Sequence, residues 1–196
     1  ELRSIYKTIH HSPFTIAPGI EDIHSQIEFM LTEKLGDAGK KIHSARSRND
    51  QVLVDIKLFL RHEIKTLVAE IHHLFELLQT QSEKYKDHLM PGYTHLQIAM
   101  PSSFGLWFGA YAECLVEDAE LLEAAFRLAN KNPLGSGAGY GSSFPLDRKL
   151  TTVLLGFEAP HVNVVNAQMS RGKTEFYVLN AISQIATTLS RLAMDV

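Results

Sequence analysis

The stretch that decides the fold is residues 49–80, NDQVLVDIKLFLRHEIKTLVAEIHHLFELLQT. Apolar residues recur there at intervals of three and four, and neither glycine nor proline interrupts them. This spacing places them on one stripe of an α-helix. Ser47, with Asp50 three residues later, provides a capping box at the start. The pattern therefore predicts a long helix that begins near Asn49 and is stopped before Pro91-Gly92.

Further helical patterns run from about 102 to 130 and from 167 to 196, and shorter ones occupy 20–36 and 147–155. Three long patterns favour an all-α fold, a bundle of long helices. Each residue of a helix adds about 1.5 Å, so helices of this length extend beyond one small domain. We therefore expect them to pack against other copies of the chain. Strand patterns are almost absent, and residues 162–165 are the single candidate.

Two domains are predicted from this organisation. Residues 1–90 form an N-terminal helical domain that runs into the first long helix, and residues 91–196 form the central long-helix bundle. The chain starts with Glu1 instead of methionine and ends at Val196 inside a helical pattern. We therefore expect a fragment of a longer protein, with the bundle domain incomplete at its C-terminus.

Composition excludes several classes of protein. The 196 residues are 45% hydrophobic and 21% charged, as in ordinary globular proteins. The net charge of −3 does not suit a nucleic-acid partner, and no apolar run reaches the length of a membrane span. One cysteine excludes a disulfide framework and suits a reducing compartment such as the cytoplasm, and no signal peptide is evident.

The first candidate site is the run SARSRNDQ at residues 44–51, at the start of the first long helix. Cations at a helix N-terminus oppose its dipole unless an anion lies between them. Free backbone N–H groups, together with Ser47, Arg48 and Asn49, therefore predict a site for a carboxylate or phosphate.

The second candidate is the run PGYTHLQ at residues 91–97, between two long helices. Thr94 offers a hydroxyl, and His95 offers a group that accepts a proton near neutral pH. A loop between rigid elements is a common place for such chemistry.

Two other patterns are weaker. The run GSGAGYGSS at 135–143 follows no strand and is followed by no Walker lysine, so it is interpreted as a turned segment between helices. Glu21 with His24, and Glu70 with His73, match the Glu-x-x-His pattern of carboxylate-bridged metal bundles. A carboxylate/His metal-binding helical bundle is therefore kept as an alternative, although we expect no metal.

Taken in order, these segments resemble the argininosuccinate lyase family of the fumarase/aspartase superfamily. The resemblance begins near Ile20 and covers nearly all of the chain from there. It rests on the residues EDIH at 21–24, GDAGKKIHSARSRNDQ at 36–51, PGYTHLQ at 91–97, PLGSGA at 133–138, DR at 147–148 and LSRLA at 189–193.

The resemblance implies an all-helical homotetramer whose active sites each draw on several subunits. It implies cleavage of argininosuccinate into arginine and fumarate, the last step of arginine biosynthesis, without metal or organic cofactor. By the same resemblance His95 is the catalytic residue, active in proton transfer. The resemblance also assigns substrate binding to Ser47, Arg48, Asn49, Thr94 and His24.

Some features of the family are missing or altered. Its flexible loop with a catalytic serine is absent, so we expect this fragment alone to be inactive. Ala45 replaces a usual glycine, Met100 replaces a usual glutamine, and residues 168–172 replace a more acidic segment. Another fumarate-releasing lyase of the superfamily therefore remains an alternative, as does a bundle of the same fold that has lost its activity.

Overall fold

A computed structural model describes residues 1–196 and confirms the all-helical fold class. The helices are α1 (Leu2–His11), α2 (Ile23–Leu35), α3 (Asp37–Lys40), the 3₁₀ helix η1 (Lys41–His43), α4 (Arg48–Lys84), α5 (Phe104–Ala129), α6 (Arg148–Leu154), α7 (Val164–Met169) and α8 (Lys173–Asp195). The strands are β1 (Leu89–Thr94), β2 (Gln97–Ser103), β3 (Lys131–Asn132) and β4 (Ala159–Pro160). None of these helices combines the length and the hydrophobicity that a membrane-spanning helix requires.

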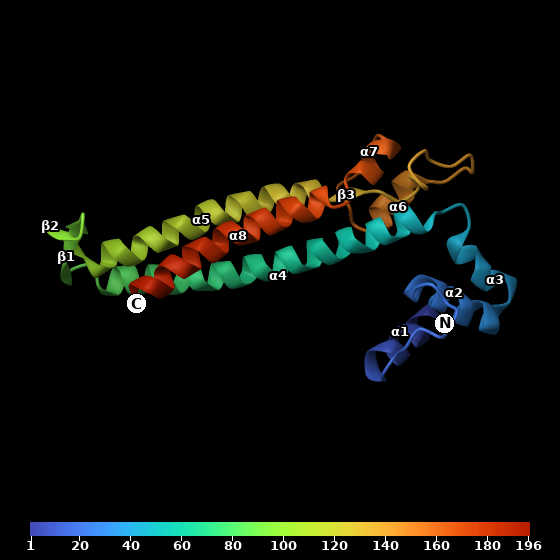
Figure 1. The fold of residues 1–196 in the computed structure, drawn as a ribbon, viewed down its shortest axis with the longest axis horizontal. Helices are drawn as coiled ribbons and strands as arrows, with labels where there is room; N and C mark the ends of the chain where they lie inside the picture. Colours follow the sequence, from blue (N-terminus) through green and yellow to red (C-terminus); the bar gives the residue numbers. More distant parts are fainter.

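The core of the molecule is an elongated bundle in which α4, α5 and α8 lie side by side (Figure 1). Its buried residues recur at intervals of seven on α4, at Ile64, Ile71 and Leu78, as in coiled-coil packing. Residues from the other two helices fill the same seam, and the full set is Ile64, Ile71, Leu78, Ala112, Leu115, Leu122, Ala125, Val178, Ala181 and Ile185. The apolar stripe quoted above therefore predicts the bundle correctly.

Helix α4 begins within one residue of the predicted position. Ser47 is the N-cap, and the capping box with Asp50 is formed. The helix ends at Lys84, and Gly105 at the start of α5 lies directly against its last turn. A Cβ on Gly105 would lie 2.6 Å from the carbonyl oxygen of Ser82, so only glycine allows the two helices to approach this closely.

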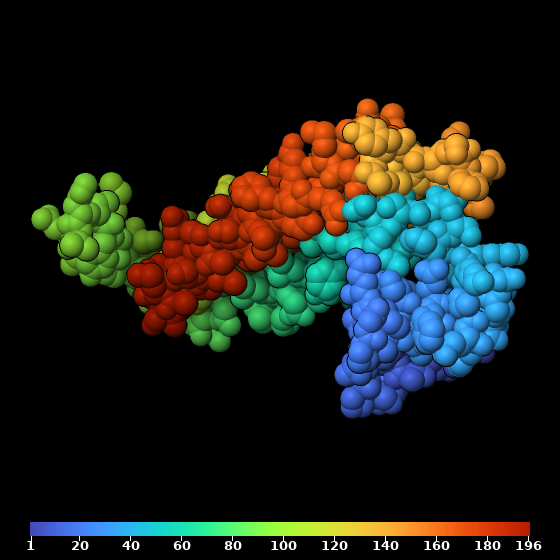
Figure 2. Space-filling model, turned by 45° about the vertical axis from the view of Figure 1, so that its right-hand side comes forward, coloured from blue at the N-terminus to red at the C-terminus, as the bar shows by residue number.

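The antiparallel hairpin of β1 and β2 was not predicted. It projects from one end of the bundle (Figure 2) and pairs Pro91 with Pro101 and Thr94 with Gln97. Both strands are almost wholly exposed, so neither has the buried face that produces an alternating apolar pattern. The turn residues His95 and Leu96 have φ of 50° and 63°. Such positive φ values favour glycine, and neither position is a glycine, so the sequence carries no signal for this turn.

Two expectations near the C-terminus are wrong. Residues 162–165 are not a strand, because the side chain of Asn163 caps α7 by accepting from the amides of Val165 and Asn166 at 2.9 Å. The predicted helix from 167 to 196 is broken between α7 and α8. Gly172, with φ of 72°, starts α8 in a new direction.

The helices α1, α2 and α3 form a smaller lobe beside the start of α4, at the end opposite the hairpin (Figures 1 and 2). Asp22 caps α2 by accepting from the amide of Ser25 at 2.8 Å, and Gly36, with φ of 58°, ends it as predicted. The division into domains at residue 90 stays a prediction.

Candidate functional site

The start of α4 gathers side chains from three directions. Ser47 caps the helix, and its Oγ accepts from the amide of Asn49 at 3.2 Å. Asn49 lies beside the α7–α8 corner, where its Oδ1 accepts from Nη1 of Arg171 at 2.8 Å. Ser47 and Asn49, predicted from the sequence to act together, therefore lie side by side. Arg171, which that prediction missed, lies beside them.

Arg48 points in another direction, towards α2. Its guanidinium contacts Asp22 at 3.1 Å, Ser25 at 3.0 Å and Gln51 at 2.7 Å, and Glu28 lies 3.9 Å away. Burial favours the neutral form of Asp22. The hydrogen bonds from Ser25 and the charge of Arg48 outweigh it and hold the pKa of Asp22 below its ordinary value. Arg48 thus ties the N-terminal lobe to α4.

His24 lies close to Arg48 in this contact between the N-terminal lobe and α4. Its Nε2 is 3.2 Å from Oδ2 of Asp55, which lies about two turns along α4 from Arg48. Burial raises the pKa of Asp55, although the nearby charges of His24 and Arg48 oppose that shift. The structure therefore brings His24, Ser47, Arg48 and Asn49 to the same end of the bundle.

Thr94 and His95 lie at the other end. They occupy the tip of the β1–β2 hairpin, and both are exposed. The 37 residues of α4 separate the two groups, which corresponds to about 55 Å of helix. Within one copy of the chain, the structure does not bring Thr94 and His95 together with the other predicted site residues.

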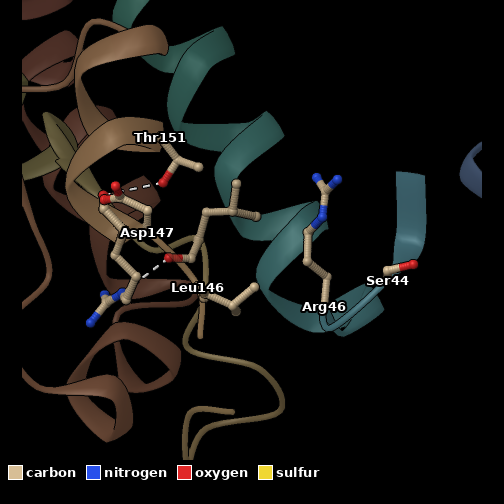
Figure 3. Close-up of a pocket in the computed structure, with 8 residues that line it drawn as sticks. Ser44, Arg46, Leu146, Asp147 and Thr151 are labelled. Carbon is tan, nitrogen blue, oxygen red and sulfur yellow. Dashed lines mark hydrogen bonds between the residues drawn. The ribbon is translucent and has the colours of Figure 1, made fainter. Parts of the chain in front are cut away.

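A cavity of about 210 Å³ adjoins the start of α4 (Figure 3). Ser44 and Arg46 line it from the turn before the helix, and Leu146, Asp147 and Thr151 line it from α6 and the preceding loop. Unlike Arg48, the Arg46 side chain has no hydrogen-bond or ion-pair partner in the chain. Ala45, directly before it, has φ of 59°, the left-handed conformation that favours glycine.

A metal site is not formed. No three His, Cys, Asp or Glu side chains converge in an arrangement that could hold a metal ion. Glu21 precedes α2, whereas Glu70 and His73 lie in the middle of α4. The two Glu-x-x-His pairs therefore do not face one another, and the metal-bundle alternative has no site in this chain.

The sequence model of a lyase family matches residues 2–196. The chain belongs to this lyase family. It is 64% identical over 195 residues to argininosuccinate lyase of Phocaeicola vulgatus, an alignment that covers 100% of this chain and 44% of that protein. For argininosuccinate lyase of Thermotoga neapolitana the identity is 40%, over 100% of this chain and 49% of that protein. These findings confirm the resemblance to argininosuccinate lyase, and the chain spans less than half the length of these curated relatives.

Solved structures of other lyases share the fold. EDDS lyase, in complex with formate, is 26% identical with a TM-score of 0.74, over 87% of this chain and 35% of that one. An EDDS lyase variant with bound fumarate is 25% identical, also with a TM-score of 0.74, over 86% of this chain and 35% of that one. Class II fumarase from Schistosoma mansoni is 19% identical with a TM-score of 0.65, over 77% and 36%, and shows the fold alone. The fumarase/aspartase type of bundle is thereby confirmed.

Proposed function

We propose that this chain carries part of the active site of an argininosuccinate lyase of the cytoplasm, which acts in the last step of arginine biosynthesis. The observation that carries the proposal is the identity of 62–64% to argininosuccinate lyases over the full chain. The reaction eliminates arginine from argininosuccinate and leaves fumarate. It needs neither metal nor organic cofactor, because acid and base groups suffice.

The predicted residues fit this elimination. Removal of the proton next to a carboxylate places negative charge on that carboxylate, which donors held in advance can stabilise. Ser47 and Asn49 present such donors at the positive end of α4, and Arg48 and His24 lie at the same end of the bundle, on its α2 side. Thr94 supplies a further hydroxyl for binding, and His95 transfers a proton.

In a homotetramer, the two groups of residues can come together from different subunits. Because the hairpin of one chain lies a whole helix away from its own Ser47, we propose that it completes the site of another copy. Apolar side chains on the outer faces of α4, α5 and α8, such as Phe59, Leu106 and Leu179, are more than 60% exposed and provide a surface for that packing.

The test is fumarate release by the full-length gene product, followed by ultraviolet absorbance. Separate assays offer argininosuccinate, adenylosuccinate, aspartate, malate and EDDS, the compound after which the EDDS lyase neighbours are named. We expect turnover of argininosuccinate well above that of the others. Preference for another substrate would favour a different fumarate-releasing lyase, and no turnover of any would favour a bundle that has lost its activity.

A second experiment tests the shared site. A His95→Asn variant and a Ser47→Ala variant, each weakly active, are unfolded together and refolded as mixed assemblies. Some sites then receive a normal hairpin and a normal α4 start, so activity should exceed that of either variant alone. Activity that stays at the level of the separate variants would show that both groups come from the same chain.

A further inference from the structure

The glycine-rich segment 133–141 has no role in the proposed chemistry, yet a fully buried carboxylate holds it. Asp50 is 0% exposed, and its Oδ2 accepts from the amides of Gly135 and Gly137, both at 2.9 Å. Its Oδ1 accepts from the amide of Ser47 at 3.1 Å. A single side chain therefore joins the segment to the N-cap of α4.

Only glycine lets the segment present these amides. Gly135 and Gly137 have φ of 88° and 60°. A Cβ on Gly137 would lie 2.7 Å from the carbonyl oxygen of Gly141, so any larger residue would force the backbone to move. The amides of Gly135 and Gly137 are spaced so that both donate to the Asp50 carboxylate on α4. The sequence alone did not reveal this pairing.

A second buried charge on α4 holds the segment's flank. Lys57, seven residues after Asp50 and so on the same face of the helix, is also 0% exposed. Its Nζ lies 2.8 Å from Nε2 of His161 and donates to the carbonyl oxygen of Lys131 at 3.3 Å. These two residues belong to the β3–β4 region, because the amide of His161 donates to the carbonyl oxygen of Asn132 at 2.8 Å.

Arg148 links the two anchor points. Its Nη2 donates to the carbonyl oxygen of His161 at 2.7 Å, and its Nε donates to that of Leu134 at 3.1 Å. Gln168 of α7 adds a contact to Ser136 Oγ at 2.9 Å. The segment is thus held from α4, α6 and α7 at once.

We propose that Asp50 and Lys57 are positioning residues, a two-point clamp that fixes segment 133–141 and through it the substrate-binding start of α4. The clamp acts directly on Ser47 through the Asp50 carboxylate. It also sets part of the wall of the cavity described above, since Leu134 and Gly135 line that cavity together with Ser44 and Arg46. This inference rests on the proposed function for its effect on catalysis, but its structural part stands independently.

The experiment compares Asp50→Asn with Asp118→Asn in the full-length protein. Asp118 is a matched control, a buried carboxylate in the middle of α5 that accepts from Thr188 Oγ1 at 2.7 Å and makes no hydrogen bond to the site residues. Asparagine keeps the shape but turns an N–H₂ group towards N–H donors. Both variants should melt at lower temperature. Only Asp50→Asn should lower kcat/KM for argininosuccinate, by about 100-fold, because small misplacements of binding groups cost that much.

Amide hydrogen exchange gives a readout that does not depend on activity. In Asp50→Asn, peptides covering 44–51 and 133–141 should exchange faster together, whereas Asp118→Asn should leave both unchanged. Lys57→Met, which spares the Asp50 contacts, should loosen 131–141 more than 44–51. Unchanged exchange at 44–51 in Asp50→Asn would overturn the clamp. Equal loss of kcat/KM in the two aspartate variants would overturn its catalytic role, whereas an inactive wild-type protein would count against the proposed function alone.

Discussion

The two ends of α4 carry the two halves of the proposed active site, and they are built in opposite ways. At the start of the helix, the side chains of Ser47, Arg48 and Asn49 all make hydrogen bonds within the chain. At the hairpin, the side chains of Thr94 and His95 make none, and Leu96 beside them is 99% exposed. One half is assembled by the chain itself, and in the proposed homotetramer the other half is presented to a second copy.

This difference separates folding from catalysis. A residue at the start of α4 contributes to stability and to binding at once, so a substitution there changes both. The side chains of Thr94 and His95 at the hairpin tip make no hydrogen bond in their own chain, so we expect a substitution there to change only the reaction. Three predictions test this division.

The largest effect is expected for His95→Asn in the full-length protein. Loss of a general acid–base group typically lowers turnover by about 10²–10⁴-fold. Because His95 makes no side-chain hydrogen bond in its chain, the melting temperature and the assembly should stay as in the wild type. Steady-state fumarate release and thermal unfolding measure the two quantities. Ser47→Ala is the contrasting variant, since loss of an N-cap should also cost about 1 kcal/mol of stability.

The prediction fails in either of two ways. Unchanged turnover in His95→Asn would remove the catalytic assignment. A marked loss of stability would mean that the hairpin tip supports the fold after all, and the contrast between the two ends would disappear.

Periodicity predicted the long helices because burial and helical repeat coincide there. The stripe that contains Ile64 and Ile71 is also the core. The hairpin escaped prediction because its strands have no buried face. The break between α7 and α8 was not predicted, because Gly172 interrupts the helix but not the apolar pattern of the sequence.

Site residues could be predicted to lie together only where they are close in the sequence. Ser47 and Asn49 could be grouped because they are neighbours in the sequence at a helix start. The partners of Asp50, Gly135 and Gly137, are 85 and 87 residues away, and no local pattern indicates that pairing. The position of His95 relative to Ser47 depends on the length of α4 and, in the proposed assembly, on other copies of the chain, so short motifs alone do not reveal it.

The second prediction concerns the stability of the fold at acid pH, and it tests the end of the bundle where α4 starts. Burial lowers the pKa of His161 to about 4, helped by the charges of Lys57, Lys131 and Arg148, against an ordinary value of 6.5. Between pH 6.5 and 4 the unfolded chain therefore takes up a proton that the folded chain refuses. Stability should fall by up to about 3 kcal/mol over that range, since each such pH unit costs about 1.4 kcal/mol.

Urea unfolding at several pH values measures this slope. His161→Gln should flatten it between pH 6.5 and 4, and His62→Gln, at an exposed position of α4, should leave it as in the wild type. On the alkaline side, burial lowers the pKa of Lys57 to about 8 from 10.5, so stability should rise between pH 8 and 10.5. Equal slopes in His161→Gln and the wild type would contradict the buried pair.

The smallest effect is expected from the two arginines that flank Ser47. Arg48→Met removes the partner of Asp22 and Ser25, and should cost about 2 kcal/mol, because it leaves a carboxylate and other acceptors without their donor. Arg46→Met removes a side chain with no partner in the chain and should stay within about 0.5 kcal/mol of the wild type. Arg48→Lys should recover only part of the loss, since one ammonium cannot replace a planar guanidinium directed at three acceptors.

Urea unfolding of the three variants measures the order of their stabilities. Equal costs for Arg46→Met and Arg48→Met would show that the bonds of Arg48 add nothing to the fold, and the start of α4 would then be no more firmly built than the hairpin.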